Sequence, residues 1–348
     1  MFAGGFLAGF ATRRQNSMAS DDDQTAATRS YPRLLGDIGG TNARFAWLAG
    51  PGETLGTVAT YPCADHASLQ DAMQHYLDAH QMPAPRWCAI GIANPVVGDL
   101  VRMTNHDWSF SIAEVQARFG MQRFLVINDF TALALALPAL QARDLRQVGA
   151  GAPMAQAPIG LIGPGTGLGV SGLLPAQGGR GAIPINGEGG HVTLAGTSAV
   201  EDAVIERLRL RFGHASAERA LSGPGLVNLH AALCEIEGMP VTAMDAAEVT
   251  RQAGAGGDPR CVQAVDLFFS FLGTVAGNLA LSLGARGGMY IGGGIVPRLG
   301  ERIDRSSFRE RFEEKGRFRG YLCGIPTYVV QASTSPALIG AARALEDL

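Results

Sequence analysis

Clusters of glycine at the ends of apolar segments are the feature that most limits how this chain can fold. The sequence has 47 glycines in 348 residues, about twice the usual frequency of roughly 7%. Nineteen of them fall into five windows, at 36–41, 163–172, 187–190, 222–225 and 284–294. Because 47% of the residues are hydrophobic, these windows interrupt a core-forming chain and not a disordered one. They predict turns at which the backbone closely approaches a partner, and we expect that partner to be mostly ligand.

The scarcity of lysine excludes several kinds of nucleotide site. Lys315 is the only lysine, so the chain has neither a P-loop of the G-x-x-x-x-G-K-[ST] type nor the strand lysine of protein kinases. The net charge is −3 and there is no basic block, which argues against nucleic acid as a partner. The five cysteines are scattered without a C-x-x-C pair, a pattern typical of reduced thiols in a cytoplasmic protein without a structural zinc.

Predicted strands and helices alternate, which indicates an α/β protein. Two hairpins with glycine-rich turns, at 33–48 and 159–173, hint at an internal duplication. Further strands are predicted at 87–93, 124–128, 288–292 and 326–331, and helices at 68–80, 111–119, 130–137, 199–212, 224–236, 263–285, 301–314 and 336–347. A Pro/Gly-rich stretch at 141–158 indicates a crossing between domains. We therefore expect a disordered extension (1–31, with Met18 as an alternative start), a smaller α/β domain (32–139 plus 332–348) and a larger one (140–331).

Two apolar segments resemble membrane or export signals. Residues 267–285 carry no charge over a length that could just span a bilayer. Polar residues recur at every fourth position from Ser270 to Ser282, so we expect a buried helix and no membrane partner. The N-terminal apolar run is followed, not preceded, by Arg13 and Arg14, contrary to an export signal.

The first glycine window has the sequence G-D-I-G-G-T. Backbone N–H groups in such a turn can form a nest for a phosphate, and Thr41 adds a hydroxyl donor. Asp37 is a candidate to hold Mg²⁺ through water, since Mg²⁺ prefers oxygen ligands and keeps several waters. A plain tight hairpin explains the motif equally well. The candidate residues of this window are Gly36, Asp37, Ile38, Gly39, Gly40 and Thr41.

The second window, G-P-G-T-G-L-G at 163–169, predicts another phosphate nest around Gly165, Thr166 and Gly167. It overlaps a G-x-G-x-x-G pattern at 167–172, with Glu188 about 20 residues further on, as in dinucleotide-binding proteins. That fingerprint needs a helix after the loop. The residues that follow are rich in glycine and proline, so a nicotinamide oxidoreductase remains only an alternative.

Several polar residues lie where a ligand would be bound. Asp129 follows a buried strand, at the end where open α/β sheets bind ligands, although a helix N-cap is the simpler interpretation of Asp129 alone. G-E-G-G-H supplies Glu188 and His191, and Glu218 lies in S-A-E-R-A-L-S-G-P-G. Glycines around Glu188 disfavour a metal-binding helix there, and His191 could equally be a core histidine.

The last window leads a strand into a glycine triplet. Backbone without side chains allows a flat ligand such as a nucleoside base to lie directly on it, whereas a simple turn between strand and helix is the alternative. The triplet consists of Gly292, Gly293 and Gly294.

Together these blocks resemble a known family. LLGDIGGTNARFA, MTNHDWSFSIAEV, VINDFTALALALP, GPGTGLGV, GEGGHV, SAERALSGPGLVNL, GNLALSLGARGGMYIGGGIVPR and FEEKGRFRGYL follow one another from about residue 34 to the C-terminus. In this respect the chain is similar to the bacterial glucokinases of the enterobacterial type, which are ATP-dependent hexose kinases of the actin/sugar-kinase superfamily.

The resemblance implies a two-domain actin-like ATPase (ribonuclease H-like) fold with a cleft between the domains. It implies transfer of the γ-phosphoryl group of ATP to the 6-hydroxyl of D-glucose, the first step of glycolysis, by a cytoplasmic homodimer that uses Mg²⁺. Asp129 matches the general base, and the sugar ligands match Asn128, Glu188, His191 and Glu218. Gly36 to Thr41 and Gly165 to Gly167 match the two phosphate loops, and the triplet at 292–294 matches the adenosine site.

These roles suit the chemistry of the residues. An ordinary aspartate pKa of about 3.9 keeps Asp129 ionised at neutral pH. Without a P-loop lysine, the backbone nests, Thr41, Thr166 and Mg²⁺ must balance the phosphate charge. A sugar sensor without catalytic activity is a further alternative. The sequence lacks the clustered cysteines and the N-terminal helix-turn-helix of the related repressors, which disfavours a sugar-responsive repressor.

Overall fold

The structure is a computed structural model that describes residues 29–104, 106–178, 181–332 and 335–347. Two mixed β-sheets dominate it, one of five strands in the order β3-β2-β1-β4-β7 and one of six in the order β11-β10-β9-β12-β13-β8. The first sheet contains β1 Arg33–Ile38, β2 Asn42–Leu48, β3 Gly56–Pro62, β4 Trp87–Ile92 and β7 Arg123–Asn128. The second contains β8 Leu145–Val148, β9 Ile159–Pro164, β10 Leu168–Leu174, β11 Ile183–Asn186, β12 Met289–Ile291 and β13 Thr327–Val330.

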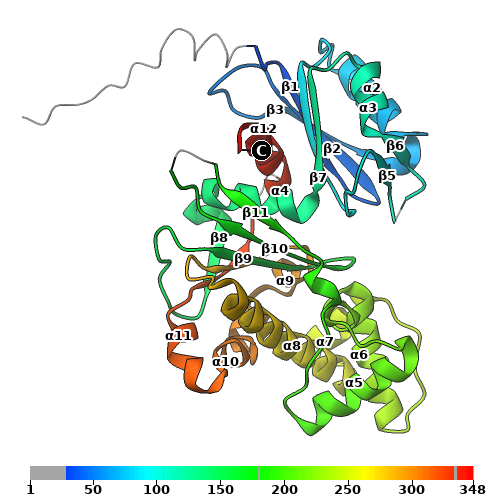
Figure 1. The fold of residues 1–348 in the computed structure, drawn as a ribbon. Coiled ribbons are helices and arrows are strands. Elements are labelled where there is room, and N and C mark those ends of the chain that lie inside the picture. Colours follow the sequence, from blue (N-terminus) through cyan, green and yellow to red (C-terminus); the bar gives the residue numbers. More distant parts are fainter. Residues whose placement is uncertain (1–28, 105, 179–180, 333–334, 348) are drawn as a thin grey trace, which may run out of the picture.

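The helices pack on both faces of these sheets (Figure 1). They are α2 Leu69–Ala79, α3 Ile112–Arg118, α4 Asp129–Ala136, α5 Ala199–Phe212, α6 Gly223–Ile236, α7 Ala246–Gly254, α8 Pro259–Leu283, α9 Ile295–Leu299, α10 Phe308–Glu313, α11 Arg319–Cys323 and α12 Pro336–Asp347. A small separate hairpin joins β5 Leu100–Arg102 to β6 Ser109–Ser111. Single turns of 3₁₀ helix include η4 Gly189–His191, η5 Ala217–Arg219 and η6 Gly300–Arg305.

The two sheets share one core topology. In each, an antiparallel hairpin is followed by two parallel strands: β2-β1-β4-β7 in the first sheet and β10-β9-β12-β13 in the second. Both predicted hairpins are therefore confirmed, and their equivalent places in the two sheets support the internal duplication. Parallel strands need crossover connections, which contain α2 and α3 in the first sheet and the helices α5 to α11 in the second.

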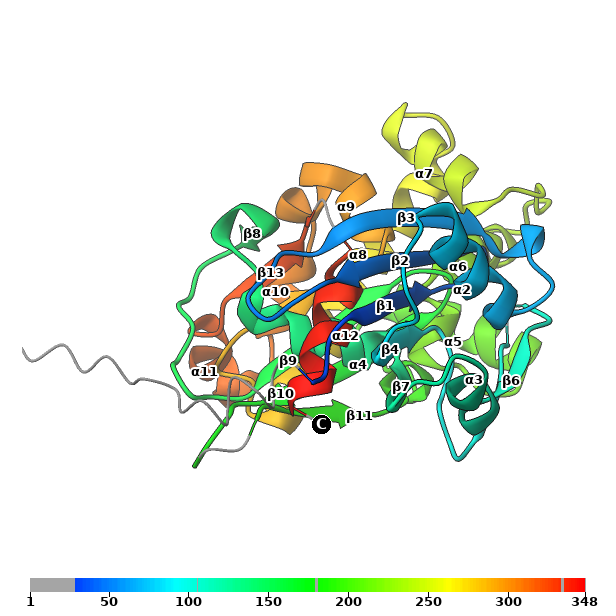
Figure 2. The ribbon, with the colours of Figure 1, turned by 90° about the horizontal axis from the view of Figure 1, so that it is seen from above.

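Helices α4 and α12 lie between the two sheets (Figures 1 and 2). Leu338 and Ala341 of α12 pack on Leu35 of the first sheet. Leu135 of α4 packs with Leu173 of the second sheet. Because α4 contacts both sheets, the residue at its start is held at the junction between them.

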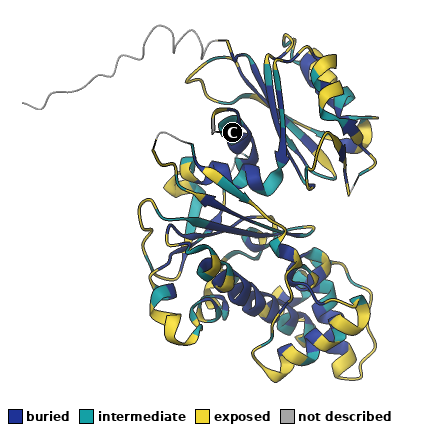
Figure 3. Ribbon diagram, in the orientation of Figure 1, coloured by how far each residue is buried: buried dark blue, intermediate teal, exposed yellow. Residues whose placement is uncertain are grey.

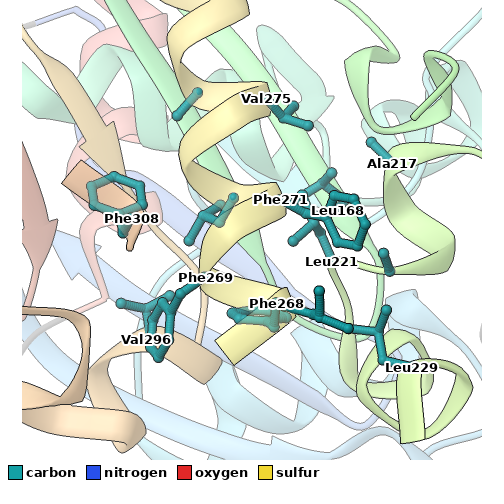
Figure 4. Close-up of a cluster of buried hydrophobic side chains, with 14 of the residues drawn as sticks. Leu168, Ala217, Leu221, Leu229, Phe268, Phe269, Phe271, Val275, Val296 and Phe308 are labelled. Carbon is teal, nitrogen blue, oxygen red and sulfur yellow. The ribbon is translucent and has the colours of Figure 1, made fainter. Parts of the chain in front are cut away.

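Helix α8 is the centre of the largest core cluster (Figure 4). Phe268, Phe269 and Phe271 are fully buried along it, and Figure 3 shows the helix buried over most of its length. It is the one described helix that is long and apolar enough to cross a membrane, but 78% of its most apolar window is buried inside the protein. The prediction of a buried helix is therefore confirmed, although α8 begins four residues before the predicted 263.

Some predicted elements differ from the structure. The single helix predicted at 301–314 is wrong: η6 and α10 are separated at Ser306, whose hydroxyl donates to the Ile303 carbonyl and accepts from the Phe308 N–H. Serine side chains that bond to nearby backbone compete with helix formation in this way. The stretch at 141–158 contains the edge strand β8, which pairs with β13. The dinucleotide fingerprint is also ruled out, because Gly169 and Gly172 lie inside strand β10 and the next element is strand β11, not a helix.

The predicted N-terminal extension lies mostly outside the described residues. Its last part is described, and there Tyr31 is buried. The Arg33 guanidinium lies 4.1 Å from the centre of the Tyr31 ring and also donates to Ser30. The folded part therefore begins slightly before residue 32.

Candidate active site

Two cavities meet at the start of α4. The larger has a volume of about 930 Å³ and runs from Asp37 and Asp129 to the glycine triplet, α9 and the start of α12. The smaller, of about 320 Å³, is lined by Asn128, Asp129, Glu188, Glu218 and the loop at 165–167, among other residues. Asp129, Phe130 and Gly293 line both cavities. The structure thus brings together most of the predicted site residues around one carboxylate.

The N-cap of α4 is Asn128 and not Asp129, so helix capping does not explain Asp129. The Asn128 side-chain oxygen accepts the N–H groups of Phe130 at 2.9 Å and Thr131 at 3.3 Å, so Asn128 is the N-cap of α4. Its amide nitrogen donates to the Asn94 carbonyl at 3.4 Å. The Asp129 carboxylate accepts only the neighbouring Phe130 N–H, at 2.9 Å, among the described donors. One of its oxygens is consequently available to a ligand.

Burial changes the acidity of Asp129. Desolvation of the carboxylate, with a smaller contribution from the nearby charge of Asp37, raises the pKa of Asp129 to about 6, against the hydrogen bond from Phe130 that lowers it. The expectation of an ordinary pKa is therefore wrong. The group is still largely ionised at neutral pH, and it is a stronger base than an exposed aspartate.

The other predicted sugar ligands occupy different positions. Glu188 is exposed and lines the smaller cavity. Glu218 is half-buried, and its carboxylate accepts the Leu168 N–H at 2.9 Å. His191 is exposed at the end of η4 and is not among the residues that line either cavity.

The second glycine loop is a tight turn. The Gly165 N–H donates to the Gly167 carbonyl at 2.8 Å, and the Gly165 carbonyl accepts the Gly223 N–H from the start of α6. A Cβ on Gly167 would lie 2.5 Å from the Glu218 carboxylate, whereas one on Gly165 would meet nothing closer than 4.0 Å. Thr166 is exposed between them. This loop leaves backbone open at Gly165 and lies against the Glu218 carboxylate at Gly167.

The first glycine loop is built differently. Asp37 pairs in register with Arg44, whose guanidinium donates to its carboxylate at 3.3 Å, and Ser335 donates to the same oxygen at 2.5 Å. Thr41 is exposed, and the Gly39 N–H donates to the Asn42 carbonyl.

Two candidates in this window are core residues of strand β1. The space for a Cβ on Gly36 is filled by Ile90, and Ile38 is fully buried. Neither residue lines a cavity, and residues 39–41 do not line one either, so Asp37 is the residue through which this window contributes to the larger cavity.

The glycine triplet lines the larger cavity. Gly293 has a φ of +75°, and a Cβ there would collide with the Pro164 carbonyl. Gly292 lies against Leu133. A Cβ on Gly294 would have only the Arg298 guanidinium within 4 Å, at 3.8 Å. Bare backbone is thus exposed mainly at Gly294, next to a cation.

Many of the remaining window glycines are required for packing. The space that a Cβ would take on Gly163 and Gly169 is occupied by the Phe130 ring, and that on Gly190 by the Leu168 backbone. The expectation that these windows face mainly ligand is therefore wrong for such positions. The Phe130 ring packs against the second hairpin, and this packing holds the adjacent Asp129 in position.

Sequence reasoning did not identify several other residues of the site. Arg44 and Arg298 line the larger cavity, and Asn94 lines the smaller one with its side-chain oxygen bound to the Thr104 N–H. The lack of lysine was a usable signal for the arginines, because a phosphate site without lysine is more dependent on arginine.

Comparisons with known proteins agree with this geometry. The chain is 55% identical to the glucokinase of Aromatoleum aromaticum over 93% of this chain and 97% of that protein. Its structure matches the glucokinase of an Antarctic psychrotroph with a TM-score of 0.83 and 35% identity, covering 91% of this chain and 99% of the other. It matches a ROK-family glucokinase of Streptomyces griseus, solved with glucose and AMPPNP, with a TM-score of 0.59 and 20% identity over 90% and 99% of the two chains.

Two sheets of one topology with a cleft between them form the two-domain actin-like ATPase fold of the sugar kinases. Within that class, the glucokinase family model matches residues 34–348. The chain belongs to the glucokinase family and is a kinase that phosphorylates glucose.

Proposed function

We propose that this glucokinase transfers the γ-phosphoryl group of ATP to the 6-hydroxyl of D-glucose, with Asp129 as the general base. The observation that carries the proposal is the position of Asp129, which lines both the larger and the smaller cavity. Only a group at that junction can contact a sugar in one cavity while a nucleotide phosphate reaches it from the other. The Streptomyces griseus relative holds glucose and AMPPNP together, which fits two adjoining sites.

The smaller cavity is suited to glucose. Carboxylates accept strongly from sugar hydroxyls, and Glu188 and Glu218 line this cavity together with Asp129. Asn128 offers its amide nitrogen, whereas His191 lies outside the cavity lining and would contact the sugar only after a movement of η4. A site built from such groups rejects sugars that lack a hydroxyl, because its buried polar groups would then be unpaired.

The larger cavity is suited to ATP. Gly292 to Gly294 line it and offer backbone to the adenosine. The loop at 165–167 lines the adjoining smaller cavity beside Asp129, where its backbone and Thr166 would donate to the transferred phosphate, and the turn at 39–41 would add the exposed Thr41 hydroxyl. Arg44 and Arg298 supply positive charge in place of a lysine.

Asp37 fits a role toward Mg²⁺. One of its oxygens is occupied by Arg44 and Ser335, while no described donor contacts the other, Oδ1. A single free carboxylate oxygen suits an ion that keeps several waters. Bound there, Mg²⁺ would neutralise phosphate charge during transfer.

The chain's own residues then perform the reaction. Glu188 and Glu218 orient the sugar so that its 6-hydroxyl donates to the free oxygen of Asp129. The hydroxyl oxygen attacks the γ-phosphorus as the bond to the ADP oxygen breaks, and Asp129 accepts the proton. Phosphoryl transfer of this kind depends mainly on positioning and charge stabilisation, which the rigid start of α4 supplies.

Replacement of the base tests the proposal. We expect Asp129→Asn to lower kcat by at least about 1,000-fold while the Kd for glucose changes less than about tenfold. Glucose-dependent ADP release measures the first quantity and calorimetry the second. Since ionising a buried carboxylate costs free energy, the Asn variant should unfold at or above the wild-type temperature at pH 8, which shows that it is folded. Asp266→Asn, an exposed surface carboxylate, is the matched control. Turnover of the Asp129 variant near that of the control would disprove the assignment.

Two broader expectations accompany this function. The enzyme is expected to act in the cytoplasm, where its nucleotide donor is available, and to form a homodimer as the family resemblance implies. Sedimentation velocity at several protein concentrations measures the second, and a purely monomeric protein would contradict it.

A further inference from the structure

Three side chains able to bind a metal converge where α6 meets α8. His230 lies in α6, Asp258 is the N-cap of α8 and Cys261 lies in its first turn. One ligand atom of each lies within 4.8 Å of the other two. None of the three lines either cavity of the active site, so the mechanism does not use them.

Two separations around His230 match those between neighbouring ligands of one metal ion. The His230 Nε2 atom lies 3.6 Å from an Asp258 carboxylate oxygen and 3.6 Å from the Sγ of Cys234, one turn later on α6. An N–H···O hydrogen bond normally measures about 2.7–3.2 Å, so the His–Asp contact is too long for one. Zinc bonds of about 2.0–2.3 Å at tetrahedral angles place neighbouring ligand atoms roughly 3.3–3.8 Å apart.

The surroundings enclose this group on all but one side. His230 is 1% exposed, Cys234 2% and Cys261 fully buried, whereas the Asp258 side chain is 19% exposed. Arg260 shares the Asp258 carboxylate, with contacts of 3.0 and 3.2 Å, and orients it. Asp258 already accepts three hydrogen bonds from Arg260, so the indication of an ion is the spacing: the buried imidazole and the carboxylate lie 3.6 Å apart, as two ligands of one metal ion would.

We propose that His230, Cys234, Asp258 and Cys261 bind a structural Zn²⁺ ion that ties α6 to α8. Cys234 contacts the imidazole but lies outside the group of three, so it becomes the fourth ligand by rotating toward the ion. Each cysteine releases its thiol proton to solvent as its sulfur binds. Asp258 is the exposed side of the site and thus the path by which the ion enters.

An ion at this site would stabilise α6, whose opposite end contacts the loop at 165–167. At the opposite end of α6, the Gly223 N–H holds the Gly165 carbonyl of the phosphate loop. An ion at His230 and Cys234 would fix the far end of the same helix on the core helix α8. Spacing alone conceals such a site, because its H-x-x-x-C and D-x-x-C halves are separated by a loop and α7.

Metal analysis and cobalt substitution of the full-length reduced protein test the proposal. We expect about one equivalent of zinc after expression in zinc-supplemented medium. We also expect one equivalent of added Co²⁺ to give the visible bands of a tetrahedral site with a thiolate-to-metal charge-transfer band. Cys234→Ser/Cys261→Ser should lose both signals. Cys323→Ser, which removes the one half-exposed thiol, should keep them.

A second variant guards against misfolding. Asp258→Asn keeps a good helix N-cap but removes the charge, and should weaken Co²⁺ binding about tenfold or more while the protein stays folded. Zinc should also raise the unfolding temperature of the wild type more than that of the double variant. A wild-type protein that binds neither metal would overturn the proposal, as would a spectrum that survives in the double serine variant or depends on Cys323.

Discussion

The two glycine hairpins occupy equivalent places in the two sheets but carry opposite chemistry. In the first, the register pairs Asp37 with Arg44, two charged groups that face the larger cavity. In the second, the pair at the corresponding distance from the turn is Gly163 and Gly169, and the Phe130 ring fills the space above them. One hairpin therefore presents charge to a ligand, while the other receives a side chain from the neighbouring helix.

This difference shows how one structural unit can serve two functions. A phosphate site needs charge and open backbone on one side of the transferred group. The general base needs rigid support on the other, since a small displacement of a catalytic group is costly. Phe130 provides that support because it immediately follows Asp129 and is enclosed by glycine backbone. In the proposed mechanism the second hairpin would therefore position the base, and the first would face the phosphates.

Of the changes to the two hairpins, an alanine in place of a glycine of the second should lower activity and stability most. Gly169→Ala places a Cβ inside the Phe130 ring, so the ring and the start of α4 must shift. Overpacking of this kind costs about 1–3 kcal/mol of stability, and we expect kcat to fall about 100-fold because Asp129 moves with Phe130. Steady-state kinetics and thermal unfolding measure the two losses.

A smaller side chain at 130 provides the control for that variant. Phe130→Ala in the Gly169→Ala background removes the collision, and should recover much of the lost stability. A single Gly169→Ala variant with wild-type kcat would contradict the supporting role of this hairpin.

A change in the charged pair Asp37 and Arg44 of the first hairpin should have the second-largest effect on activity. Asp37→Asn keeps the size of the side chain and its contacts with Ser335 but removes the charge toward Mg²⁺. We expect kcat to fall about tenfold or more and the Mg²⁺ concentration for half-maximal activity to rise, with little change in stability. Titration of activity with Mg²⁺ at saturating ATP provides the measurement. Unchanged Mg²⁺ dependence would place the ion elsewhere.

The sequence was sufficient to predict the hairpins, the buried helix α8 and the carboxylates of the site. Apolar strands with polar residues at their ends predict such positions because the ends of neighbouring parallel strands converge. It was not sufficient to distinguish a glycine that faces a ligand from one that faces Phe130, since both need the same missing Cβ. Nor did it identify Asn94 or Arg298, which follow β4 and the glycine triplet by only a few residues but belong to no recognisable motif of their own.

Alanine substitutions at two glycines of one turn should change the KM values for ATP and for glucose differently. Gly165→Ala meets no atom closer than 4.0 Å and lies on the open side of the loop, so we expect the KM for ATP to rise about three- to tenfold while that for glucose is unchanged. Gly167→Ala brings a Cβ to 2.5 Å from the Glu218 carboxylate and should instead raise mainly the KM for glucose. Equal effects of both variants on both substrates would mean that the turn acts as a single unit.

The pH dependence should show the smallest and most specific effect of the first hairpin on the base. Because the pKa of Asp129 is raised to about 6, kcat/KM for glucose should fall tenfold per pH unit below that value as the base becomes protonated. Asp37 contributes to this rise, since its negative charge disfavours ionisation of Asp129. Asp37→Asn should therefore move the acid limb to lower pH, by roughly half a unit or less for one partly solvated charge. Profiles of both enzymes from pH 5 to 8.5 measure the shift, with Asp266→Asn as the neutral-site control. A limb that moves upward in the Asp37 variant would mean that Asp37 acts on the base through structure and not through its charge.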